Sequence, residues 1–167
     1  MEFVPAPMDD VQRTIAAEVV DALAAEDLDV VRPGLAAAEG NRVWVSPPLL
    51  SVAAGLLAIV TAAAPETPWE FSDALWDRYL PNQKPRTAPE WRRASYAVQA
   101  AGCLAGGIWL DVGTTESFWR GSFWPDILPV IELLTAVALA ELPLTREQLQ
   151  HRLRVLLNLA SPTAPPA

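Results

Sequence analysis

Few residues in this sequence have the types and spacing that catalysis requires. His151 is the only histidine and Cys103 the only cysteine among the 167 residues. Hydrolases that use a serine or cysteine nucleophile pair it with a histidine, so a site of this kind would have to use His151. Arginine follows His151 directly, and Cys103 lies among glycines and alanines, a setting typical of an inert buried thiol. We therefore predict a solvated histidine, a buried thiol and no catalytic residues.

One row of acidic side chains has the composition of a metal site. Its members recur at intervals of four, three and four residues and share one face of a helix: Glu66, Glu70, Asp73 and Asp77. Hard cations prefer several carboxylate oxygens, but metal sites in helical bundles draw ligands from a second helix as well. The sequence has no second such row, no phosphate-binding glycine loop and no zinc spacing. A solvated helix face is expected, without metal or cofactor.

Aromatic residues are the most distinctive feature of the sequence. There are seven tryptophans, and the densest cluster combines four large rings with an arginine in seven positions: Phe118, Trp119, Arg120, Phe123 and Trp124. Tryptophan, phenylalanine and arginine are enriched at protein interfaces. We predict that these five residues bind a partner. The alternative is that the rings close one end of the helical bundle.

Charge is distributed unevenly along the chain. The formal net charge is −8, and residues 1–41 contain nine acids and two bases, so the remainder is nearly neutral. An acidic chain is poorly suited to bind phosphate backbones, and no nucleic-acid partner is expected. The predicted last helix contains three arginines, Arg146, Arg152 and Arg154. We expect them on solvated faces, with pairing inside the fold or between subunits as the alternatives.

The most apolar stretch is too short for a membrane span. Residues 43–65 lack charge, but the expected helical part, residues 49–64, has 16 residues where about 20 are needed. The N-terminal residues lack the basic flank and apolar run of a signal peptide, and one cysteine permits no internal disulfide. We predict a cytoplasmic protein, with membrane association as the less favoured alternative.

Alanine and leucine dominate the sequence, which predicts an all-α fold with about six helices. The first helix should bury one face through Val11, Ile15, Val19 and Leu23, and Pro33 and Gly34 should break the chain before a short turn at 35–39. Ser46 is expected as an N-cap, and threonine capping boxes begin at Thr67, Thr87 and Thr145. The expected helices span residues 7–27, 46–64, 67–80, 87–110, 125–142 and 145–159.

The two halves of the chain resemble each other at an offset of 78 residues. Nine residues are identical at this offset, from Pro47 and Pro125 to Leu75 and Leu153. We predict one domain, residues 1–160, that contains two related three-helix halves, residues 9–80 and 88–159. Chance similarity between alanine- and leucine-rich helices is the alternative. Residues 161–167, with three prolines, are expected to form a flexible tail.

Together these patterns favour a non-enzymatic helical module that acts by binding protein: an adaptor, an assembly component or an inhibitor. Its partner would be another protein or a second copy of the chain. Two alternatives stay open. One is a helical enzyme that binds a small ligand or metal, and the other is a membrane-associated helical protein.

Overall fold

The computed structural model describes residues 3, 5, 7–24, 28–62 and 124–159. Its regular elements are all helices, with no strand in these ranges, which confirms the all-α class. The elements are α1 (Asp10–Ala22), the 3-10 helix η1 (Leu28–Val31), α2 (Arg32–Gly40), α3 (Ser46–Thr61), α7 (Trp124–Glu141) and α8 (Arg146–Leu156). The count of about six helices is not confirmed, because the helices expected at 67–80 and 87–110 lie outside the described residues, as does the tail.

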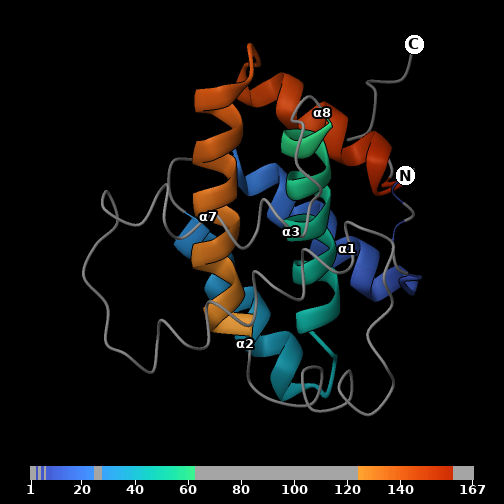
Figure 1. The fold of residues 1–167 in the computed structure, drawn as a ribbon. Helices are drawn as coiled ribbons and strands as arrows, with labels where there is room; N and C mark the ends of the chain where they lie inside the picture. The colour runs from blue at the N-terminus through green and yellow to red at the C-terminus, as the bar shows by residue number, and fades with distance from the viewer. Residues whose placement is uncertain (1–2, 4, 6, 25–27, 63–123, 160–167) are drawn as a thin grey trace, which may run out of the picture.

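Helices α3 and α7 form the centre of the described fold. They lie side by side and run in the same direction (Figure 1). Both bury their largest aliphatic side chains to below 2% exposure, namely Leu49, Leu50, Leu56 and Leu57 in α3 and Ile127, Leu128, Ile131 and Leu134 in α7. Only two residues of α3 are not buried, as expected for a helix that is apolar on all sides and belongs in a protein interior.

Threonine hydroxyls in these apolar helices form hydrogen bonds to backbone carbonyls of their own helix. Thr61 donates to the carbonyl of Leu57 at 2.7 Å, and Thr135 donates to the carbonyl of Ile131 at the same distance. Each bond reaches back four residues along its own helix, so the hydroxyl needs no partner from elsewhere. Across the part of the chain that the structure describes, no buried side-chain polar atom lacks a hydrogen bond.

Helices α1 and α8 pack around the central pair. Ile15, Val19 and Leu23 are buried, as the periodicity of the first helix predicts, whereas Val11 is 53% exposed and departs from the expected face. The chain bends by 117° between α7 and α8, so that α8 crosses over the end of the α3–α7 pair (Figure 1). No single helix in the described ranges is both long and apolar enough to cross a membrane, although α7 and α8 taken together would pass on length and composition.

Helix starts agree with the sequence at one end of the chain and differ at the other. Thr145 caps α8 as predicted: its hydroxyl accepts from the backbone N–H of Gln148, and the Gln148 side chain accepts from the N–H of Thr145. Asp9 and Gln12 form the same arrangement before α1, so that helix begins at Asp10 rather than at residue 7. The prediction missed it because Asp9 takes the N-cap place that threonine has in the other capping boxes.

Three other expectations about helix boundaries are wrong. Ser46 is the first residue of α3 and not its N-cap, a position that Val45 occupies without a side-chain hydrogen bond. Pro33 and Gly34 do not break the chain but lie in the first turn of α2, where a missing N–H costs nothing. Prolines at the start of α3 follow the same rule and were predicted correctly. Helix α1 ends at Ala22, short of the expected residue 27.

Candidate functional site

Trp124 is the one residue of the predicted partner-binding cluster that the structure describes. It begins α7 and is 7% exposed, and its indole N–H donates to a carboxylate oxygen of Glu39 at 2.9 Å. Glu39 lies in the last turn of α2, so this bond joins the start of α7 to the end of α2. Phe118, Trp119, Arg120 and Phe123 lie outside the described residues, and partner binding by this cluster stays a prediction.

Trp44 is an exposed aromatic residue that the sequence analysis did not select. It lies between α2 and α3 and is 52% exposed. The chain reaches it through Arg42, whose φ of 62° is left-handed, and a bond from the N–H of Val43 to the carbonyl of Ala38 closes the end of α2. Val45, directly after Trp44, is 3% exposed.

The two residues before α3 differ sharply in exposure. Val45 is the N-cap of α3, with helical backbone angles of φ −88° and ψ −30°, and its side chain is buried. Trp44, directly before it, is exposed. No local sequence pattern marks this ring as exposed.

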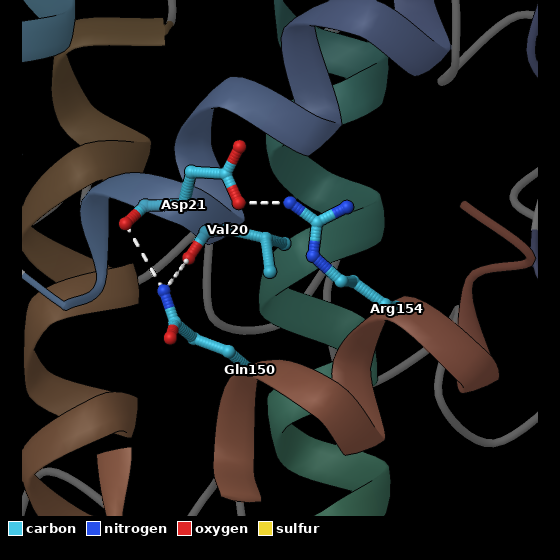
Figure 2. A network of polar contacts seen from close by, with 4 residues as sticks. All are labelled: Val20, Asp21, Gln150 and Arg154. Atoms are coloured by element: carbon cyan, nitrogen blue, oxygen red, sulfur yellow. Dashed lines mark hydrogen bonds and ion pairs between the residues drawn. The ribbon is translucent and has the colours of Figure 1, made fainter. Parts of the chain in front are cut away.

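Polar side chains of α8 meet the C-terminal end of α1. Gln150 donates through its amide to the carbonyls of Val20 and Asp21 at 2.9 and 3.0 Å (Figure 2). One turn earlier, Arg146 donates to the carbonyl of Leu23 at 3.1 Å. One turn later, Arg154 pairs with the carboxylate of Asp21. The three donors are spaced by four residues and form one stripe along α8, which we call the polar stripe.

The polar stripe shows which arginines of the last helix face solvent and which contact the rest of the fold. Arg154 is 8% exposed although it carries a charge, because the Asp21 carboxylate pairs with it. The expectation of a solvated face is therefore wrong for Arg154, whereas half-buried Arg146 hydrogen-bonds to a backbone carbonyl. Arg152 is exposed, as expected for a solvated face.

The opposite side of α8 borders a surface hollow of about 310 Å³. Four lining residues belong to α8 and one precedes it: Glu147, Gln148, His151 and Arg152, with Leu144. His151 is exposed, as predicted, and Glu147 precedes it by one helical turn. The residues that the structure describes contain no group of three or more histidine, cysteine or acidic side chains placed to hold a metal ion. Cys103 and the acidic row at 66–77 lie outside those residues.

No relative of this chain is found among family models, curated proteins or solved structures. A function therefore has to be inferred from the residues themselves. Two described surfaces carry exposed side chains of interest: the corner around Trp44 and the outer side of α8.

Proposed function

We propose that this protein is a non-enzymatic helical module that binds another protein, or a second copy of itself, through aromatic side chains. The observation that carries the proposal is Trp44, a tryptophan 52% exposed on a firmly closed corner. Tryptophan offers a large contact area at a low cost in side-chain entropy and is the residue most enriched at binding hot spots.

Trp124, the described member of the predicted aromatic cluster, lies at the same end of the molecule as Trp44. Trp44 precedes the first residue of α3 by two positions, and Trp124 is the first residue of α7. The two helices run in parallel, so their first residues share one end (Figure 1). The bond from Trp124 to Glu39 brings the α7 start to α2, five residues before Trp44. In this proposal Trp124 fixes its end of the predicted cluster beside α2, near Trp44.

The proposal includes a cytoplasmic location and the two related halves, residues 9–80 and 88–159. At the offset of 78 residues, the residues of α3 all correspond to residues of α7. Burial repeats at the same offset: Leu50 and Leu128 are 0% and 1% exposed, and Leu56 and Leu134 are both 0% exposed. Two copies of one unit that pack about their apolar helices would give this match.

Substitution of Trp44 tests the proposal. Trp44→Ala in the full chain should reduce recovery of bound protein in affinity capture, or self-association in sedimentation velocity, by about tenfold or more, as loss of a hot-spot residue does. The melting temperature should stay close to that of the unchanged protein, because half of the ring is already in water.

Val155→Ala is the matched control. Val155 is 68% exposed on α8, so its truncation should change neither binding nor the melting temperature. Unchanged binding by Trp44→Ala would contradict the proposal. A large fall in its melting temperature would instead assign Trp44 to the core.

A further inference from the structure

Among the described residues, few backbone donors reach the carbonyls at the C-terminal end of α1. Its C-cap residue, Leu23, has φ −63° and ψ −19°, so the chain does not make the left-handed turn that closes many helices. The backbone bonds that follow are long, from Leu23 to the carbonyl of Val20 at 3.2 Å and from Ala24 to that of Asp21 at 3.3 Å. The last turn of α1 contains no basic residue to balance the negative end of the helix dipole.

The polar stripe of α8 provides hydrogen-bond donors and positive charge at this end of α1. The amide of Gln150 reaches the carbonyls of Val20 and Asp21 at shorter distances than the backbone donors do, and Arg146 reaches the carbonyl of Leu23. Arg146 and Arg154 also place two positive charges at the negative end of α1. These donors come from residues 123 to 133 positions further along the chain.

A different set of side chains holds α8 on its other neighbour. Leu149, Leu153 and Leu157 are each at most 1% exposed. A Cβ atom added at Gly55 of α3 would lie 3.1 Å from Cδ2 of Leu153 and 3.4 Å from Cδ2 of Leu157. These leucines therefore rest against the backbone of α3, and α8 has an apolar attachment to α3 and a polar attachment to α1.

We propose that α8 and the end of α1 form a conformational clasp, in which the last turn of α1 is ordered only while α8 is docked. When α8 leaves α3, the carbonyls of Val20, Asp21 and Leu23 lose their side-chain donors, and the turn frays. The coupling is reciprocal, so a change that loosens α1 also weakens the docking of α8. This inference does not depend on the proposed binding function.

Hydrogen exchange measured by mass spectrometry on the full chain tests the clasp. The double variant Arg146→Ala/Gln150→Ala should accelerate exchange in peptides covering residues 18–24 by about tenfold, from the loss of side-chain hydrogen bonds to that turn. Exchange in α3 and α7 should stay unchanged. Arg152→Ala is the matched control, because it removes an exposed arginine of the same helix and should leave residues 18–24 as they are.

A second variant approaches the clasp from its apolar side. Gly55→Val should displace Leu153 and Leu157 without removing a polar contact, and exchange should then accelerate in α8 and in residues 18–24 together. Faster exchange in α8 alone would overturn the proposal. The proposal would also be overturned if residues 18–24 exchanged at the same rate in the double variant and in Arg152→Ala. An equal rise of exchange in every helix of the double variant would overturn it as well.

Discussion

The contact between α3 and α7 and the contact between α1 and α8 use opposite kinds of side chains. The first consists almost entirely of aliphatic residues, and the hydroxyls inside it bond to their own helix. The second joins carbonyl groups and a carboxylate to a stripe of two arginines and a glutamine. Comparison of the two shows how one small fold separates the source of its stability from the means of positioning its last helix.

The magnitudes of the two contacts explain this division. Complete burial of a leucine or isoleucine contributes about 1.5–3 kcal/mol, and α3 and α7 together bury eight such side chains below 2% exposure. A hydrogen bond contributes about 1 kcal/mol net, since the groups would otherwise bond to water. Apolar burial is non-directional, whereas hydrogen bonds require a given distance and angle. The polar contact thus sets where α8 lies more than it stabilises the fold.

The largest effect should come from truncation inside the apolar pair. Leu56→Ala and Leu134→Ala each leave a cavity at a site that is 0% exposed and should lower the free energy of unfolding by about 2–5 kcal/mol. Urea denaturation measures this loss. Because the two leucines occupy matching positions in the proposed halves, their losses should be similar. A loss below about 1 kcal/mol at either site would contradict the claim that the contact between α3 and α7 is the main source of stability.

A smaller effect is expected at the start of α8. Thr145→Ala removes the N-cap and should lower the unfolding free energy by about 1 kcal/mol. Thr14→Ala is the matched control: Thr14 is exposed inside α1, its hydroxyl only bonds back to the carbonyl of Asp10, and alanine is the better helix former. Thr14→Ala should therefore be neutral or slightly stabilising. Equal losses in the two threonine variants would contradict the capping role.

Local sequence patterns predicted the features that depend on near neighbours. The capping box at Thr145 and the prolines that open α3 are each set by residues within one turn, and the structure has them where expected. The boundaries that were wrong also have local causes. Asp9 caps α1 through a less common residue pair, and Pro33 fits a first helical turn as well as it fits a break.

Contacts between residues far apart in the chain could not be predicted from the sequence. The four-residue spacing of Arg146, Gln150 and Arg154 is visible in it, but their acceptors are backbone carbonyls more than 120 positions away, which no side-chain pattern marks. The exposure of Trp44 is likewise set by the assembled fold, because its neighbour Val45 is buried and no local pattern distinguishes the two.

The division between a stable apolar pair and a separately opening clasp can be measured directly. Native-state hydrogen exchange of the unchanged protein at increasing, sub-denaturing urea gives an opening free energy for each amide. The central amides of α3 and α7 should exchange only through global unfolding. Those of α8 and of residues 20–24 should share one lower opening free energy and one urea dependence. Separate values for α8 and the end of α1, or one value for all four helices, would contradict the account.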